Sequence, residues 1–224
     1  MKINKILSII LISVLSISLW EVGKKQIGYV QSRMTYQNIR REREQYKDMQ
    51  EYLFDKDYDW ISISNTAIEY PLVKGSDNQF YLTHNYLGKE SISGAIYYGA
   101  DEELYQGLLT IVYGHSMKDG SMLNNLHYFQ KDKERFKESI LTIDTKEGTK
   151  TYKPIGYGVC EGKNPFYRTV DNINAEEGLC MIRNNCDYFI EENVSNGHII
   201  ALVTCDYSIE DGRLVVFYME NSNN

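Results

Sequence analysis

The hydrophobic pattern of the chain begins with one long apolar run close to the N-terminus. The run from Ile6 to Trp20 contains 15 residues and no charge, and Lys2 and Lys5 precede it. At about 1.5 Å per residue it spans roughly 22 Å, so flanking residues must help to cross a hydrocarbon core of about 30 Å. The run has no polar face, which disfavours a buried core helix. It predicts a membrane anchor over residues 6–22, with a cleaved signal peptide as the alternative.

A charged segment with helical periodicity follows the apolar run. Apolar residues recur at near-helical steps between Val30 and Leu53, which predicts a helical linker over residues 23–56. The lysines before the anchor favour a cytoplasmic N-terminus over residues 1–5. The folded domain, residues 57–224, is then expected outside the cell, attached to the membrane by a single span.

Beyond Asp57 the pattern changes to short runs typical of strands. Residues 60–64 alternate between apolar and polar, as a half-buried strand does. Seven further runs have strand character, several bounded by glycine turn signals: 67–73, 94–99, 107–114, 139–145, 149–160, 198–204 and 212–219. Eight short strands with few long helices predict a mostly β domain, either a closed barrel or a sandwich. Helical insertions are expected at 117–138 and 174–192.

Charge and missing motifs narrow the classes of function. The net charge is −7, but residues 1–28 carry +3 and the remainder −10. A domain this acidic lacks the basic face of a general nucleic-acid binder. The sequence has no HExxH, paired Cys-x-x-Cys, P-loop or G-x-S-x-G motif, so zinc, nucleotide and serine-hydrolase chemistry have no support.

The four cysteines are an even number, which permits two disulfides outside the cell. Their spacing shows no dense disulfide framework, and a domain of this length can bury a core without one. We interpret Cys160, Cys180 and Cys186 as structural residues.

Cys205 has different surroundings. It ends one apolar strand, and Arg213 begins the next, across a short polar connection. A hairpin would bring the two side chains together, and a cation stabilises a nucleophilic thiolate. A guanidinium also offers forked donors to an oxyanion. The same pattern fits a buried cysteine beside an exposed arginine, so spacing alone leaves both interpretations open.

His115 follows an apolar strand in the sequence Ile111-Val112-Tyr113-Gly114-His115. Histidine is the usual proton carrier beside a catalytic cysteine. The other three histidines, at 84, 127 and 198, show no metal-ligand spacing, and we assign them no chemical role.

These residues together resemble the sortases. Thr204-Cys205, followed eight residues later by Arg213, looks like the sortase signature, and His115 at an upstream strand end matches the sortase histidine. The Thr-Cys-Asp-Tyr-Ser sequence, the helical insertion before the cysteine strand and the N-terminal helix resemble class B sortases in particular. The resemblance covers most of residues 50–220.

The resemblance implies a closed eight-stranded sortase-type barrel and a membrane-anchored cysteine transpeptidase of Gram-positive bacteria. Such enzymes cut a sorting-motif peptide of surface proteins after Thr, then pass the acyl group to an amine of the cell wall or of a pilin. Cys205 would be the nucleophile, His115 the general acid and base, and Arg213 the group that holds the substrate. No metal or organic cofactor is expected.

The resemblance also implies candidates for peptide binding. Asn78 and Leu82 resemble the class B segment that lines the sorting-motif groove, and Thr204 lies next to the nucleophile. Val203 stands where some class B enzymes have Ser, so one polar contact of that groove is in question. Asp206 follows the cysteine as in many class B members, and we assign it no catalytic role.

Two other functions remain open at this point. A secreted cysteine protease of the papain type would have its cysteine before its histidine, the reverse of the order here. A membrane-tethered binding module would leave Cys205 unreactive.

Overall fold

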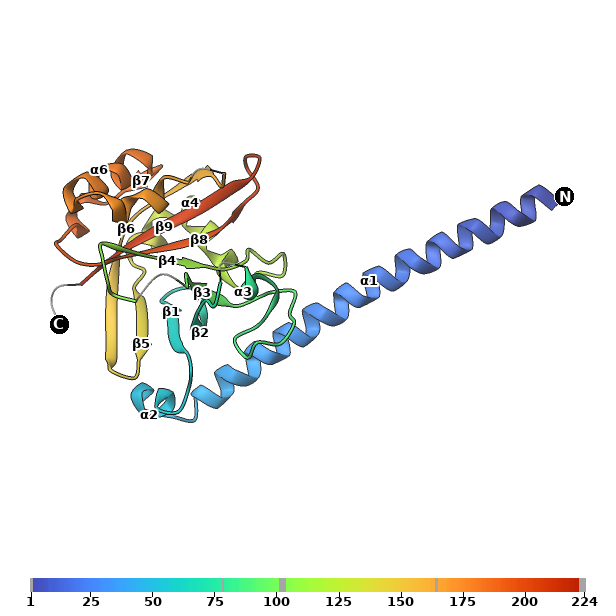
Figure 1. The fold of residues 1–224 in the computed structure, drawn as a ribbon, viewed down its shortest axis with the longest axis horizontal. Coiled ribbons are helices and arrows are strands. Elements are labelled where there is room, and N and C mark those ends of the chain that lie inside the picture. The colour runs from blue at the N-terminus through green and yellow to red at the C-terminus, as the bar shows by residue number, and fades with distance from the viewer. Residues whose placement is uncertain (1, 78, 101–103, 164, 222–224) are drawn as a thin grey trace.

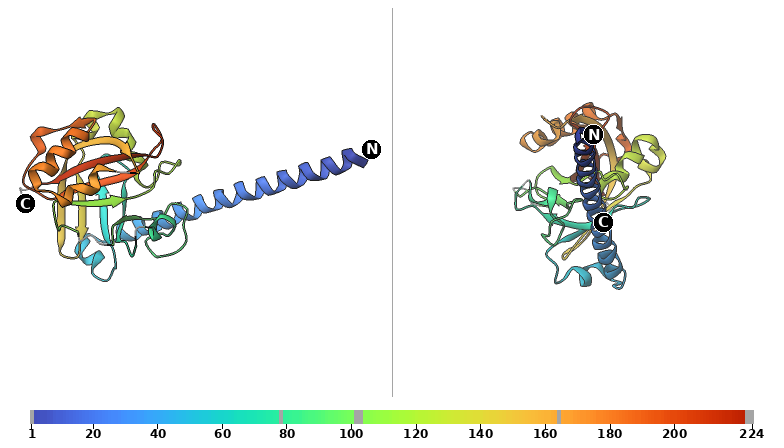
Figure 2. Two further views of the ribbon diagram at one scale, coloured as in Figure 1. Left: turned by 45° about the horizontal axis from the view of Figure 1, so that its top comes forward. Right: turned by 90° about the vertical axis from the view of Figure 1, so that its right-hand side faces the viewer.

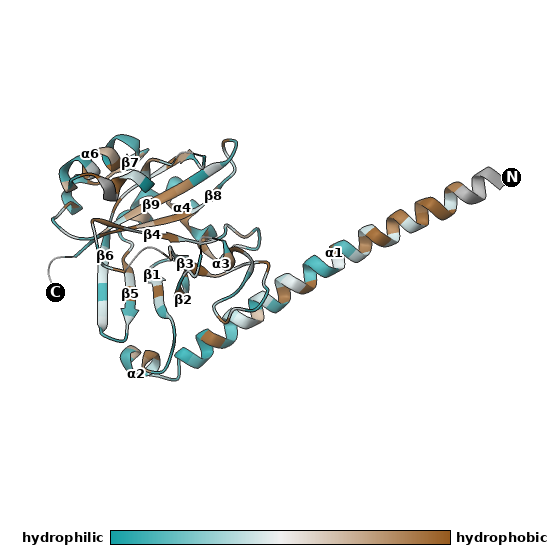
Figure 3. Cartoon of the chain, viewed as in Figure 1, coloured by the Kyte–Doolittle hydropathy of each residue, from teal (hydrophilic) through white to brown (hydrophobic). Residues whose placement is uncertain are grey.

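A computed structural model describes residues 2–77, 79–100, 104–163 and 165–221 (Figure 1). One long helix, α1 (Lys2–Arg43), projects from a β-rich body, and Figure 2 shows this projection from two further sides. The projecting part of α1 is largely apolar and exposed, as the brown bands in Figure 3 show. Among the described residues, α1 is the one helix long and apolar enough to cross a membrane.

The second half of α1 packs against the body. Tyr36 and Ile39 are buried there, and the Tyr36 hydroxyl donates to the Gly94 carbonyl over 2.5 Å. The helix predicted over residues 23–56 is interrupted, because α1 ends at Arg43 and a second helix, α2 (Met49–Leu53), begins only after the Asp48 cap. The Asp48 carboxylate accepts the amide hydrogens of Gln50 and Glu51, which satisfies the first turn of α2.

The strands close into a barrel. They are β1 (Asp59–Ile63), β2 (Glu69–Lys74), β3 (Ile96–Tyr98), β4 (Leu109–Tyr113), β5 (Leu141–Thr145), β6 (Gly148–Glu161), β7 (Tyr188–Phe189), β8 (Ile199–Asp206) and β9 (Gly212–Glu220). Their order is β5-β1-β2-β3-β4-β8-β9-β6, and pairing between β5 and β6 closes the ring of eight. The two-residue strand β7 is added to β6 outside that ring. The predicted closed eight-stranded barrel is therefore confirmed.

The two helical insertions are shorter than the sequence pattern indicated. The segment between β4 and β5 contains a 3-10 helix, η1 (Leu123–Leu126), and two one-turn helices, α4 (His127–Lys131) and α5 (Lys133–Lys137). Between β6 and β8 lie a 3-10 helix, η2 (Phe166–Asn172), and α6 (Ala175–Asn185), then η3 (Glu191–Asn193). The helix predicted over 174–192 ends early because the backbone rejoins the sheet, with the Asp187 amide donating to the Tyr157 carbonyl. The remaining short helix, α3 (Phe80–Thr83), precedes β3.

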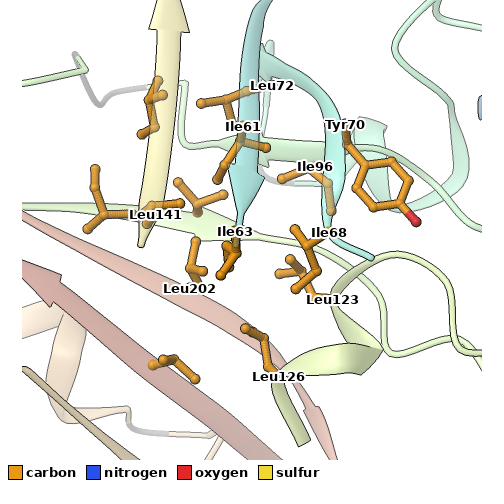
Figure 4. Close-up of a cluster of buried hydrophobic side chains, with 14 of the residues drawn as sticks. Ile61, Ile63, Ile68, Tyr70, Leu72, Ile96, Leu123, Leu126, Leu141 and Leu202 are labelled. Carbon is orange, nitrogen blue, oxygen red and sulfur yellow. The ribbon is translucent and has the colours of Figure 1, made fainter. Parts of the chain in front are cut away.

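Two apolar cores lie on opposite faces of β4, β8 and β9. The first contains Leu202 and Val216, and part of it is drawn in Figure 4 with side chains from β1, β2 and η1. The second contains Val203 and Phe217, and it is covered by residues of η2 and α6 such as Ile182. Because side chains alternate along a strand, Cys205 shares the face of Val203. It therefore lies on the side covered by η2 and α6.

Candidate active site

The end of β4 lies beside the end of β8, and this contact brings two predicted catalytic residues together. The strands are parallel, with Tyr113 paired to Val203. The Gly114 amide donates to the Val203 carbonyl over 3.2 Å, just past the last paired residue of β4. The paired register stops there, with His115 two residues beyond Tyr113 and Cys205 two residues beyond Val203. His115 and Cys205 are 90 residues apart in sequence, yet each directly follows this pair of neighbouring strand positions.

Arg213 lies on the other side of Cys205. The two residues are direct partners in the antiparallel β8–β9 pair. Side chains of directly opposed residues project from the same face of a sheet. His115, Cys205 and Arg213 thus lie at or just past the ends of three neighbouring strands, and we call this set of residues the row.

The imidazole of His115 is held by the segment before β3. Its Nε2 lies 2.7 Å from the Leu82 carbonyl oxygen, so Nε2 carries the hydrogen of this bond. Gly94 allows the close approach, because its φ is +58° and a Cβ there would lie 3.2 Å from the imidazole Cδ2. Leu82, predicted to bind peptide, is thus in contact with His115. Asn78, its predicted companion, lies outside the described residues.

The guanidinium of Arg213 is held by the turn that precedes it. Its Nη2 lies 2.9 Å from the Asp211 carboxylate, and its Nη1 donates to the Gly212 carbonyl over 2.9 Å. The group lies against Gly162, where an added Cβ would be 2.8 Å from Cζ. Neither Asp211 nor Gly162 was predicted to contact Arg213, because neither belongs to a recognisable motif.

Thr204 lies on the opposite face of β8 from Cys205. Its side chain is 2% exposed, and its hydroxyl donates to the Gly114 carbonyl over 2.7 Å. The Thr204 side chain thus connects β8 to the residue before His115. Its hydroxyl does not face the surface on which Cys205 lies.

An aromatic strip, formed by Tyr81, Tyr97 and Tyr113, lies near this row. Tyr97 and Tyr113 are partners in the β3–β4 pair with ring centroids 5.6 Å apart, and the Tyr81 ring lies 6.0 Å from that of Tyr97. Arg168 of η2 hydrogen-bonds to the Tyr113 hydroxyl. Burial, together with the nearby Tyr113, raises the pKa of Tyr97 to about 12. The strands that carry Tyr97 and Tyr113 were predicted from the sequence, but their pairing was not.

All four cysteines are free thiols. Burial raises the pKa of Cys186 to about 12, with the neighbouring Asp187 adding to the effect. Burial also raises the pKa of Cys160, although the adjacent Arg213 offsets part of that rise. Cys180 is exposed on α6. Within the described ranges, no group of three or more His, Cys, Asp and Glu side chains is placed to hold a metal ion.

Comparison with known proteins gives the family. The chain is 33% identical over 186 residues to Sortase B of Listeria monocytogenes, covering 78% of this chain and 73% of the relative. The crystal structure of sortase B from Bacillus anthracis matches with a TM-score of 0.70 and 26% identity, over 87% of this chain and 98% of that one. The Staphylococcus aureus sortase B–substrate complex has the same coverage, a TM-score of 0.68 and 22% identity, and therefore supports the fold alone. No family model matches the chain.

The closed barrel and the row formed by His115, Cys205 and Arg213 agree with this relationship. The level of identity to the Listeria relative, over most of both chains, extends the agreement from fold to family. The chain belongs to the class B sortases, a family of cysteine transpeptidases.

Proposed function

We propose that Cys205 is the nucleophile of this transpeptidase, His115 its general acid and base, and Arg213 the group that binds the substrate carbonyl. The observation that carries the proposal is the direct pairing of Cys205 with Arg213, together with the position of His115 just past β4, the strand on the other side of β8. A nucleophile needs a proton carrier and an electrophilic partner within reach of one reacting carbonyl. Neighbouring strands lie about 4.8 Å apart, which brings Arg213 within such reach of Cys205.

The reaction follows from these groups. Cys205 gives its proton to His115, and its sulfur attacks the carbonyl carbon of the substrate Thr. The forked donors of Arg213 stabilise the oxyanion that forms. His115 then protonates the leaving amine as the C–N bond breaks, which leaves a thioester on Cys205. An incoming amine attacks this thioester and loses its proton to His115, which returns it to the departing sulfur.

We further propose that a sorting-motif peptide is bound on the face shared by Cys205 and the aromatic strip. Leu82 is 39% exposed beside His115, so its side chain is available to an apolar peptide residue. Thr204 would meet the peptide only through its backbone, because its hydroxyl is bound to Gly114. The role of Asn78 stays a sequence-based prediction.

The apolar half of α1 suits a single-pass membrane anchor over residues 6–22, and a cleaved signal peptide stays the alternative. Its leucine and isoleucine side chains are exposed along the whole projecting part, which is costly in water but favourable in a bilayer. Residues 57–224 would then act on the extracellular face. The acceptor would be an amine of the peptidoglycan precursor or of a pilin.

The proposal is tested with the full chain in detergent or nanodiscs, mixed with a library of sorting-motif peptides and a small amine. We expect cleavage after Thr, an amine-dependent product, and a thioester on Cys205 when the amine is omitted. Mass spectrometry detects all three. Cys205→Ala should abolish them, and His115→Ala or Arg213→Ala should each lower kcat/KM by at least about 100-fold.

Other outcomes would support other functions. If added amine changes neither the rate of peptide cleavage nor the product, the protein is a protease. Absence of cleavage, with Cys205 unreactive toward alkylating agents, would indicate a binding module. Activity that survives Cys205→Ala would contradict the proposed mechanism.

A further inference from the structure

A polar cluster lies next to the backbone of Cys205 and takes no part in the reaction described above. It consists of Ser116, His127, Gln130 and Asp206. Both titratable members are well covered, with 21% of the His127 side chain and 5% of the Asp206 side chain exposed. The His127 ring, at the start of α4, contacts each of the other three residues.

His127 also contacts the nucleophile's own backbone. Its Nε2 lies 3.2 Å from the Cys205 carbonyl oxygen. A carbonyl oxygen only accepts hydrogen bonds, so Nε2 carries a hydrogen in this contact. The Ser116 hydroxyl lies 3.2 Å from the same nitrogen, and it in turn accepts from the Asn124 amide.

The strand pairing explains why the Cys205 carbonyl needs this donor. Carbonyls of alternate residues point to the same side of a strand, so the Cys205 carbonyl points where that of Val203 does, toward β4. The Gly114 amide donates to the Val203 carbonyl. In the same register, the Ser116 amide would donate to the Cys205 carbonyl. Ser116, however, pairs with Met122 in an isolated bridge. His127 therefore occupies the place of the ladder donor that β4 would have supplied.

The other ring nitrogen faces the residue after Cys205. The His127 Nδ1 lies 3.2 Å from Gln130 Oε1 and 3.5 Å from the Asp206 carboxylate. Burial alone would raise the pKa of Asp206, but hydrogen bonds from Ser208 and Gln130 and the proximity of His127 together lower it. The imidazole thus bridges two consecutive residues at the end of β8.

We propose that His127 is a positioning residue for the nucleophile, which fixes the Cys205 carbonyl through Nε2–H. This inference rests on the proposed role of Cys205. The pairing of β4 with β8 ends at Tyr113–Val203, whereas the pairing of β8 with β9 continues to Asp206–Gly212. His127 supplies the hydrogen bond to the Cys205 carbonyl that β4 does not make. The thiol then keeps its place in the row with His115 and Arg213.

The test compares three substitutions in the full chain. The side-chain nitrogen of Gln reaches about as far as Nε2 of histidine, whereas that of Asn reaches only as far as Nδ1. His127→Gln can therefore keep the bond to the Cys205 carbonyl, and His127→Asn and His127→Leu cannot. Lys131→Ala, at an exposed residue of the same helix, is the surface control.

We expect His127→Leu and His127→Asn to lower kcat about 10-fold while KM changes less than about 2-fold, since small misplacements of reacting groups act on the chemical step. His127→Gln should stay within about 3-fold of the unmodified enzyme. The rate at which iodoacetamide labels Cys205 should follow the same order, with peptide mapping to separate Cys205 from the exposed Cys180. Melting temperatures identify any variant that is merely unfolded.

Two results would overturn the inference. One is full activity in all three variants. The other is a loss in His127→Gln as large as in His127→Asn, because the carbonyl bond would then not be what matters. If His127→Leu does not fold, the comparison of Gln with Asn still decides. Failure of the proposed function looks different, because the unmodified chain would then show no cleavage, or Cys205→Ala would remain active.

Discussion

The hydroxyl of Thr204 donates its hydrogen to the carbonyl of Gly114 over 2.7 Å, and this bond joins the strand of the nucleophile to the residue before His115. Both groups are buried. The relative position of Cys205 and His115 therefore depends on a bond made on the face opposite to the row.

Replacing Thr204 by Val keeps the shape of the side chain but leaves the Gly114 carbonyl without this donor. A buried acceptor that loses its partner costs about 1–3 kcal/mol of unfolding free energy. We expect that loss in urea denaturation, with a fall in kcat because His115 is less firmly held. Thr204→Ser keeps the hydroxyl and should recover most of both. A rise in KM alone would instead indicate that the hydroxyl contacts the peptide.

Gly94 supports the other side of His115. Its φ of +58° disfavours any side chain, and a Cβ would press on the Tyr81 carbonyl and on the imidazole. Gly94→Ala should therefore lower both the unfolding free energy and kcat. Gly120 also has a positive φ, +85°, but open space around it. Gly120→Ala should show only the backbone strain, about 1–2 kcal/mol. Equal effects of the two substitutions on kcat would refute the contact with His115.

Much of the barrel could be read from alternation and turn signals, because each strand has its own local pattern. The proximity of Cys205 and Arg213 was also predictable, since one short turn connects them. The position of His115 beside β8 was not derivable from spacing, because β4 and β8 are parallel strands far apart in sequence and their register is a property of the folded sheet. Only the family resemblance linked them.

The sequence analysis assigned no role to His127 for the same reason. Its contacts with Cys205 and Asp206 span about 80 residues and leave no trace in local periodicity. The early end of α6 was also invisible. Tyr188 and Phe189 continue an amphipathic pattern, but the sheet edge at β6 offers their backbone a better partner than another helical turn.

The guanidinium of Arg213 lies against Gly162. A substitution at Gly162 is therefore expected to change activity more than stability. A methyl group at Gly162 would press hardest on the far end of the flexible Arg213 side chain, and it would also lie 3.0 Å from the Asp211 carbonyl oxygen. We expect Gly162→Ala to change the unfolding free energy by less than about 1 kcal/mol, yet to lower kcat/KM about 10-fold, since oxyanion donors act only when correctly aimed. Gly23→Ala, with open space around it, is the control. An unchanged kcat/KM would argue against Arg213 as the oxyanion donor.

His198 gives a prediction for the pH dependence of stability. It lies directly before β8, at the end of that strand far from Cys205. It is buried, and its Nε2 lies 3.0 Å from the Thr110 hydroxyl. Burial is the main cause that lowers its pKa to about 4. An unfolded histidine titrates near pH 6.5, so between pH 6.5 and 4 the unfolded chain takes up a proton that the folded chain refuses. The stability present above pH 6.5 should fall with decreasing pH, by roughly 3 kcal/mol at pH 4.

Comparison of the unmodified chain with His198→Gln isolates this contribution from the other titrating groups. Gln can keep the bond to the Thr110 hydroxyl but does not titrate. Both chains should therefore differ by a constant amount above pH 7, and the difference should shift in favour of the variant as the pH falls to 4. Urea denaturation at several pH values measures it. A difference that does not vary with pH would mean that His198 is protonated as readily in the folded chain as in the unfolded one, and hence that water reaches its ring.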